Sequence, residues 1–212
     1  MKKSSLAALA LLAGCAGQQV ELTEDSRRTL TTQPVHATHV LAQGGFLVES
    51  SGYTAAGVLF SPLVVLAQAA EGSTLRSELG LEDPVVRVKE RVLGALEAQY
   101  KLPNVTRMTE PMTSAQYKSL TGIVLEARTT RWGIDNNRVK YAAGVRVTRL
   151  ADGVVLWDAI CAQTIADIDK PSPTSEMLRA DNGALLKAQL NRAADTCGDQ
   201  LAAWAVQRAE RR

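Results

Sequence analysis

The chain has 212 residues, of which 46% are hydrophobic, 22% charged and 4% aromatic, and its formal net charge is +2. Two of the basic residues, Lys2 and Lys3, lie in an N-terminal segment that is interpreted below as a signal peptide, the leader of this chain. The rest of the chain carries 22 basic side chains against 22 acidic ones. This balance excludes the basic footprint of a nucleic-acid-binding protein, and the low aromatic content disfavours a surface that stacks bases or sugars.

The first fifteen residues have the layout of a bacterial secretory signal. Lys2 and Lys3 precede an apolar run, and the segment ends in Leu12-Ala13-Gly14-Cys15. A basic start, a short apolar run and small residues at the end are typical of a signal peptide. The last four residues resemble the bacterial lipobox, whose cysteine becomes the lipidated first residue of the mature chain.

We therefore expect a signal peptide at 1–14 and a diacylglycerol group with palmitate-type acyl chains on Cys15, which together anchor a protein stably. An unlipidated cysteine after an ordinary signal sequence and a short transmembrane anchor are the alternatives, although the apolar run is too short to cross a bilayer. Because Ala16 and not Asp follows the cysteine, the resemblance implies the periplasmic face of the outer membrane.

The segment after the anchor is polar. Residues 15–33 lack a sustained hydrophobic period and are interpreted as a lipidated N-terminus and flexible tether, followed by a single domain at 34–212. Residues 34–48 alternate apolar and polar side chains and are broken at Gly44-Gly45, which predicts one or two strands. His36 and His39 then lie on opposite faces of a strand and cannot share a ligand.

Residues 53–70 are the least polar part of the chain after the leader, and Pro62 interrupts them. A kinked, mostly buried helix is one interpretation of this stretch. The other two are a face that docks on lipid headgroups and a face that docks on a partner subunit. Residues 71–82, which are polar and contain Gly72 and Gly80, are interpreted as a connector.

An amphipathic helix is predicted at 85–100, where apolar side chains recur at steps of three and four. Asp83 and Pro84 provide an N-cap and a proline at the first helical position. A short strand at 105–108 and a loop with a helical turn at 111–120 follow.

The strongest strand pattern covers residues 121–163. Two alternating segments flank a polar turn at Asp135-Asn136-Asn137, and Asp152-Gly153 then forms a tight hairpin turn into a third segment that ends near Cys161. This pattern predicts an antiparallel meander with one apolar face, which helices must cover. The fold class expected is α+β, with a mainly antiparallel sheet and amphipathic helices packed on one face.

The last helix is expected to begin near Asp181 or Asn182 and to place Cys197 in the middle of its apolar stripe. Once Cys15 is assigned to lipid, Cys161 and Cys197 remain as a pair, which in an oxidising compartment predicts a disulfide bond. Two free buried thiols or half of a metal site are the alternatives, and a metal site lacks further ligands in a chain with two histidines.

The sequence contains no nucleophile elbow, phosphate-binding glycine loop, zinc-binding His-Glu-x-x-His, calcium loop or Cys-x-x-Cys motif. We therefore expect no enzymatic activity, no cofactor and no metal, and no nucleic-acid partner. Two carboxylates that converge only in the fold are the remaining route to a hydrolase.

Several motifs together resemble a family of bacterial envelope lipoproteins to which no activity is assigned. They are the lipobox at Cys15, Glu82-Asp83-Pro84, Arg131-Trp132-Gly133, the strand at 141–150 with Asp152-Gly153-Val154-Val155-Leu156-Trp157, and Asn182-Gly183-Ala184 before a cysteine-bearing helix. More loosely, the helix and meander at 85–161 are similar to lipoprotein domains related to the curli secretion channel and to penicillin-binding-protein activators. That likeness implies a domain that binds other envelope proteins.

The function expected from the sequence is that of a non-enzymatic binding or assembly component of an envelope complex, held at the outer membrane by lipid. The alternative is an oligomeric accessory of an export or transport system that uses residues 53–70 at the membrane.

Overall fold

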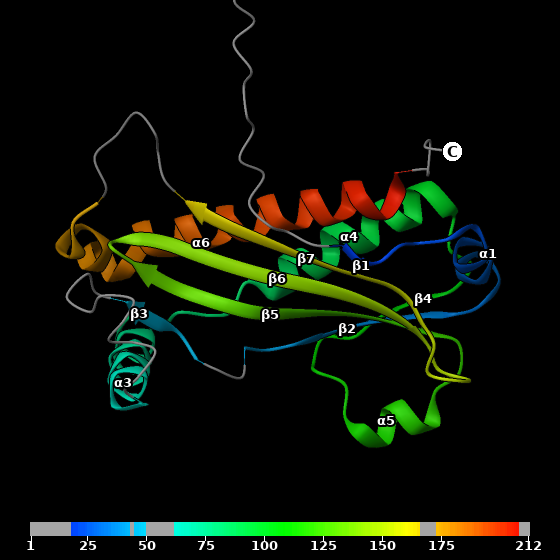
Figure 1. The fold of residues 1–212 in the computed structure, drawn as a ribbon, viewed down its shortest axis with the longest axis horizontal. Coiled ribbons are helices and arrows are strands. Elements are labelled where there is room, and N and C mark those ends of the chain that lie inside the picture. The colour runs from blue at the N-terminus through cyan, green and yellow to red at the C-terminus, as the bar shows by residue number, and fades with distance from the viewer. Residues whose placement is uncertain (1–17, 43–44, 50–61, 166–172, 208–212) are drawn as a thin grey trace, which may run out of the picture.

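The computed structural model describes residues 18–42, 45–49, 62–165 and 173–207 (Figure 1). The elements follow in the order β1 (Gln18–Val20), α1 (Glu24–Thr32), β2 (Val35–Val40), β3 (Leu47–Glu49), α3 (Pro62–Leu79), α4 (Val85–Tyr100), β4 (Val105–Arg107), α5 (Ser114–Ser119), β5 (Ile123–Asp135), β6 (Arg138–Arg149), β7 (Val155–Ile165) and α6 (Ser175–Val206).

The described strands form one seven-stranded sheet in the order β1-β7-β6-β5-β2-β4, and β3 also pairs with β5. The meander β5-β6-β7 is antiparallel as predicted, and β1 adds antiparallel to β7. In contrast, β2 and β3 lie parallel to β5, and β4 lies parallel to β2. The α+β class is confirmed, but the sheet is mixed, because helices carry the chain between the strands of its first half.

The two turns of the meander contain the residues that tight hairpins require. Asn136 and Asn137 both have positive φ, at 50° and 60°, and Gly153 has a φ of 70°. Asparagine and glycine tolerate this left-handed region better than other residues, so the polar turns predicted from the sequence close the hairpins where expected.

Helices α4 and α6 lie along one face of the sheet and bury its apolar side chains (Figure 1). The helix predicted at 85–100 is confirmed as α4, whose buried stripe includes Val88, Val92 and Leu96. The sheet contributes the largest buried side chains, among them Trp132, Trp157 and Tyr141. Apart from Val124 on β5, the described buried apolar residues form one core cluster.

The entry to α4 differs in detail from the predicted cap. Pro84 occupies the N-cap position and makes no side-chain cap hydrogen bond. The Asp83 carboxylate instead accepts a hydrogen bond from the Val85 amide at 3.1 Å, and also one from the Ala42 amide at 2.8 Å. Asp83 therefore joins the start of α4 to the segment that follows β2.

Helix α6 begins earlier than predicted. Thr174 caps it by accepting a hydrogen bond from the Met177 amide, and residues 180–183 break the helical conformation before it resumes. Asp181 and Asn182, predicted as the cap, lie in this break with positive φ, and the helical segment that carries Cys197 resumes after Gly183, close to the predicted start. The apolar stripe beyond the break, with Leu186, Leu190 and Cys197, is buried as predicted.

The assignment of residues 15–33 to a flexible tether is wrong for residues 18–33. β1 pairs with β7, and α1 follows directly, capped by Thr23, whose hydroxyl accepts a hydrogen bond from the Ser26 amide. Leu22 and Leu30 reach the core. Leu22 precedes the nine-residue helix and Leu30 is the one leucine within it, so the apolar pattern is too short to be recognised in the sequence.

The prediction of a connector at 71–82 is also wrong, because α3 continues to Leu79. Gly72 is part of the contact between this helix and the segment before β3: a β-carbon at residue 72 would come within 1.7 Å of the Phe46 carbonyl oxygen. The glycine that suggested a break is therefore required for close packing of helix against strand.

Of the apolar stretch at 53–70, residues 53–61 lie outside the described part of the chain, and residues 62–70 form the first half of α3. Within the described residues, we find no helix with both the length and the apolar character needed to span a membrane.

Candidate functional site

The candidate site is the face of the meander that points away from α4 and α6, here called the open face. Side chains alternate along each strand, so the residues between the core positions point to this face. Within the described residues, the main helix contacts of β6 are with α6 and α4, and both helices lie on the core side (Figure 1). The open face therefore has no described cover over β6.

Charged side chains are concentrated on the open face. By the alternation and register of β5, β6 and β7 they comprise five basic and three acidic residues, an excess of two positive charges. The basic ones are Arg128, Arg131, Arg138, Lys140 and Arg146, and the acidic ones are Glu126, Asp135 and Asp158. The face therefore differs from the chain as a whole, whose charges after the leader are balanced.

The centre of the face is an ion cluster built around Asp158, which is only 2% exposed. Arg128 donates to its Oδ1 atom at 3.1 Å, and Arg146 donates to Oδ2 through Nε at 2.9 Å and Nη2 at 2.6 Å. Three adjacent strands each supply one member, since Arg128 lies on β5, Arg146 on β6 and Asp158 on β7. A buried carboxylate needs such partners, because an unpaired charge in this position is strongly destabilising.

The side chain of Arg146 is 44% exposed and that of Arg128 22% exposed. Arginine offers five N–H donors in a planar arrangement, and Asp158 accepts from two of those on Arg146. The exposed part of Arg146 is therefore available to water or to a carboxylate of a partner.

Small residues lie next to this cluster. Ala142 and Gly144 on β6 and Ala162 on β7 point to the open face, and Ala162 is exposed. The Arg128 guanidinium covers Gly144, whereas the small side chains of Ala142 and Ala162 leave the backbone beside them close to the surface, so an approaching segment can contact the sheet there.

A hollow of about 490 Å³ opens where β5 changes its parallel partner from β2 to β3. β2 pairs with β5 up to Val40↔Arg128, and β3 pairs from Leu47↔Gly133 onwards. β5 has a bulge between Thr129 and Arg131, within this interval. The hollow is lined by residues Val40, Leu41, Ala42, Gly45, Leu47, Glu126, Arg128, Thr129, Thr130, Arg131 and Trp132.

One wall of the hollow is held by helix α5. The Tyr117 hydroxyl donates to the Glu126 carboxylate, and the Met112 amide donates to the Thr38 hydroxyl at 3.1 Å. Burial, followed by the hydrogen bond to Glu126, raises the pKa of Tyr117, so the phenol stays protonated as a donor at neutral pH. The α5 segment is thereby attached to the β2–β5 end of the open face.

Behind the hollow lies a buried polar chain. The Thr129 hydroxyl donates to Asp83 Oδ1 at 2.6 Å and lies 3.1 Å from the Tyr141 hydroxyl. Burial raises the pKa of Tyr141 above its usual value. The Asp83 carboxylate thus accepts hydrogen bonds from the Ala42 and Val85 amides and from the Thr129 hydroxyl. These bonds link the segment after β2, the start of α4 and strand β5 around the hollow.

Two further buried polar residues lie between β2 and α4. Lys89 donates to the Met108 carbonyl at 2.8 Å and its ammonium is 3.2 Å from Glu90. His39 is 4% exposed, and its Nδ1 atom has no hydrogen-bond partner among the described residues. Burial, followed by the charge of Lys89, lowers the pKa of His39. His36 lies on the other face of β2 and bonds the Thr121 carbonyl, so the two histidines are separated as predicted.

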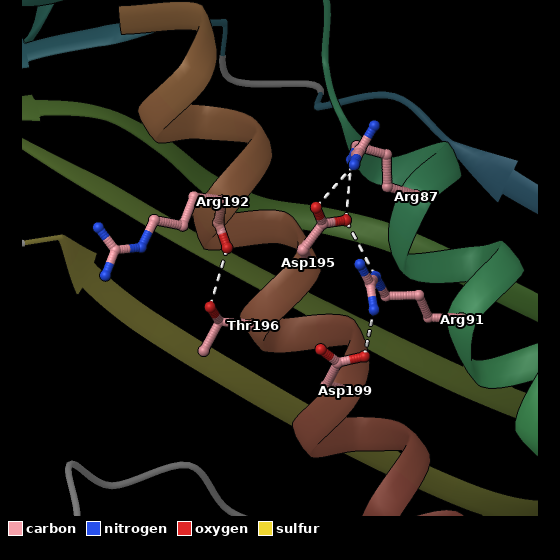
Figure 2. Close-up of polar contacts among 6 residues, drawn as sticks. All are labelled: Arg87, Arg91, Arg192, Asp195, Thr196 and Asp199. Atoms are coloured by element: carbon pink, nitrogen blue, oxygen red, sulfur yellow. Dashed lines mark hydrogen bonds and ion pairs between the residues drawn. The ribbon is translucent and has the colours of Figure 1, made fainter. Parts of the chain in front are cut away.

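The helix layer has its own ion cluster, which joins α4 to α6 (Figure 2). Asp195 accepts two hydrogen bonds from Arg87, at 2.8 and 2.6 Å, and one from Arg91 at 2.9 Å. Arg91 also donates to Asp199 at 2.5 Å. The hydrogen bonds from Arg87 hold the pKa of Asp195 below its usual value. Every charge here has a partner on the facing helix, so we assign this cluster to fold stability.

The predicted site residues are placed as follows. Cys161 and Cys197 form the predicted disulfide bond, with their Cα atoms 5.4 Å apart and both residues fully buried. Cys15 lies outside the described residues, so its lipidation stays a prediction. Within the described residues there is no group of three or more His, Cys, Asp or Glu side chains able to hold a metal ion.

The open-face cluster was not predicted as a site. Its signal in the sequence is Asp158, an aspartate within an otherwise apolar strand, where this residue type is depleted. With Arg128 and Arg146 at polar positions of the two preceding strands, the pattern is compatible with a cross-strand ion cluster. The register needed to bring the three together is not readable from one strand alone.

No family model matches the chain, and no curated protein matches it. The solved structures it resembles include the PelC dodecamer of Paraburkholderia phytofirmans, with 12% identity over 92% of this chain and 100% of that one and a TM-score of 0.38. Protein XCC0632 of Xanthomonas campestris, described as DUF330, shares 9% identity over 90% and 92%, with a TM-score of 0.40.

Lipoproteins are among the matches. Lipoprotein GNA1162 of Neisseria meningitidis shares 15% identity over 76% of this chain and 99% of that one, with a TM-score of 0.22. These likenesses are distant, and the site is therefore argued from the residues of this chain alone.

Proposed function

We propose that this protein is a lipid-anchored, non-enzymatic binding component of an envelope complex, and that the open face receives a segment of a protein partner. The observation that carries the proposal is the open face itself, which has no described cover over β6 and carries an excess of two positive charges. A partner with acidic side chains fits this face by charge complementarity.

The hollow beside the cluster supports a binding role. It adds a concave region of about 490 Å³ whose lining combines apolar side chains with the charged side chains of Glu126, Arg128 and Arg131. Concave surfaces with a few convergent polar groups are typical of binding sites. The cluster contributes fixed donors, because Asp158 holds both arginine side chains in place.

The membrane part of the proposal rests on the sequence. Cys15 ends a lipobox-like motif, and Ala16 favours transfer to the outer membrane over retention in the inner one. Incorporation of labelled palmitate into the wild type but not into Cys15→Ala tests the anchor. A shift of the Ala16→Asp variant to the inner-membrane fraction tests the sorting.

Site-specific photocrosslinking in intact cells tests the binding face. A photoreactive amino acid replaces Ala142 on the open face, or Ala98, which is exposed on α4, as the matched control. We expect a reproducible crosslinked species from position 142 that is absent from position 98 and is weakened by Arg146→Glu. Equal crosslinking from both positions, or none from position 142, would contradict the proposal.

A further inference from the structure

The distance along the chain between the predicted anchor and the folded domain is very short. β1 begins at Gln18, three residues after Cys15. Three residues span at most about 11 Å when fully extended. If the tether extended to Gln33, as the sequence indicated, the same calculation would give about 65 Å for its eighteen residues. This inference rests on the proposed lipidation of Cys15 and extends it.

We infer that one edge of the sheet faces the lipid headgroups directly. This membrane edge consists of β1, the part of β7 from Ala159 to Ile165, and the flank of α6 that carries Arg192 and Thr196. Figure 2 shows these two side chains on the side of α6 away from α4 and its arginines.

The pairing of β1 fixes which edge lies at the membrane. Gln18 is opposite Ala159, and Val20 is opposite Asp158. β1 is the first strand in the order of the sheet, so β7 is its only neighbour among the described strands. Lipid on Cys15 therefore holds the start of β1, and with it the β1–β7 edge, within about 11 Å of the lipidated residue. The other strands of the sheet lie farther from the lipid.

The chemistry of the edge agrees with this placement. Neither β1 nor β7 from Ala159 to Ile165 contains a charged residue. Val20 is exposed, and so are Ala162 and Thr164, whose side chains lie where the open face meets this edge. The exposed carboxylate of Glu21 follows β1 at the end of the strand farther from Cys15, and the two strand segments themselves bring no like charge to the phosphate headgroups.

The opposite edge has different chemistry. β4 is the last strand of the order, five strand spacings from β1, which is roughly 24 Å at about 4.8 Å each. Arg107 on β4 pairs with Glu90 and Glu97 of α4. The edge at β4 therefore carries ion pairs, which lose hydration on contact with a membrane surface, whereas the strand segments of the membrane edge carry no charge.

The orientation has a consequence for the proposed binding face. With one edge on the membrane, the sheet is roughly perpendicular to the membrane surface. The open face is then directed sideways, parallel to that surface. A partner anchored in or near the same membrane then reaches the Asp158 cluster from the side, without having to pass under the domain.

Quenching by spin-labelled lipids tests the orientation. The full-length lipidated protein is reconstituted in vesicles of phosphatidylethanolamine and phosphatidylglycerol that contain a headgroup-spin-labelled phosphatidylcholine. A fluorophore is attached through Thr164→Cys at the membrane edge or through Thr106→Cys on β4. Both positions are exposed strand threonines, and each new thiol is the one free thiol once Cys15 is acylated and Cys161–Cys197 is oxidised.

We expect quenching at position 164 to be at least about threefold stronger than at position 106, because four strand spacings, roughly 19 Å, separate β7 from β4. Inserting twelve Gly-Ser residues after Gly17 should keep the protein on the vesicles and abolish most of this difference. Equal quenching at the two positions in lipidated protein without the insert would overturn the orientation alone. Failure to acquire acyl chains on Cys15 would overturn the anchor and the orientation together.

Discussion

The guanidinium of Arg128 lies over Gly144, with its Cζ atom 3.6 Å from the position that a β-carbon on residue 144 would take. Arg128 starts on β5, passes over β6 at this glycine and donates to Asp158 on β7. The ion cluster of the open face therefore depends on a missing side chain in the central strand.

Replacing Gly144 with valine should separate Arg128 from Asp158. A β-carbon there also meets the Ala159 carbonyl oxygen and Ile160 at 3.3 Å, so neighbouring atoms must move. We expect the free energy of unfolding to fall by about 1–3 kcal/mol, the usual cost of a buried polar group that loses a partner. Urea denaturation measures this change. Ala142→Val, on the same strand and face, is the control and should change stability by less than about 0.5 kcal/mol.

The buried carboxylate itself is tested by Asp158→Asn. The substitution keeps the shape of the side chain but leaves Arg128 and Arg146 close together without a negative charge, and we expect a loss of about 2–4 kcal/mol. Asp152→Asn is a matched control, because Asp152 also accepts two hydrogen bonds from one arginine, Arg149, but lies in an exposed turn. A comparable loss for both variants would show that burial does not govern the contribution of Asp158.

Local patterns predicted the parts of this fold that depend on neighbouring residues. The alternation of apolar and polar residues at 121–163 predicted the meander, and the apolar period at 85–100 predicted α4. The paired cysteines gave the disulfide, since only one pair remained after Cys15 was assigned to lipid. In each case the signal lies within a window of about ten to twenty residues, or in a simple count.

The predictions failed where distant segments decide the structure. α1 is too short and polar to be stable alone, and it forms because Leu30 reaches a core made by other elements. The parallel placement of β2 and β3 depends on how helices return the chain, which alternation does not encode. The Asp158 cluster requires the register of three strands at once, so its one signal in the sequence, an aspartate in an apolar strand, was not enough to predict a site.

The disulfide should contribute substantially to stability. Cys161 and Cys197 are separated by 36 residues, and the chain-entropy model gives roughly 3–4 kcal/mol for a loop of this size. We expect a Cys161→Ala, Cys197→Ala double variant to lose about this much free energy of unfolding. Alkylation of the denatured, unreduced mature protein should label neither cysteine. Labelling of both would show that the bond does not form in the isolated protein.

The ion cluster between α4 and α6 should contribute less. Asp195→Ala removes the shared partner of Arg87 and Arg91, whose side chains are 47% and 40% exposed, so we expect a loss of about 1 kcal/mol. Asp199→Ala, which removes one more exposed bond, should cost about half as much. Because its pKa is lowered in the folded state, Asp195 contributes at neutral pH, and its contribution should vanish as the pH falls below its ordinary value near 3.8.

His39 should make the protein less stable in mild acid. Burial and the nearby Lys89 lower its pKa from the ordinary 6.5, so the unfolded chain binds a proton at a pH where the folded protein does not. The free energy of unfolding should therefore decrease as the pH drops from about 7.5 to 5, a window above that in which Asp195 titrates. His39→Leu removes this titration and should flatten the dependence, as measured by urea denaturation at a series of pH values. His36→Gln on the opposite face of β2 keeps His39 and should retain the wild-type slope. An unchanged slope in His39→Leu would assign the acid sensitivity to other groups.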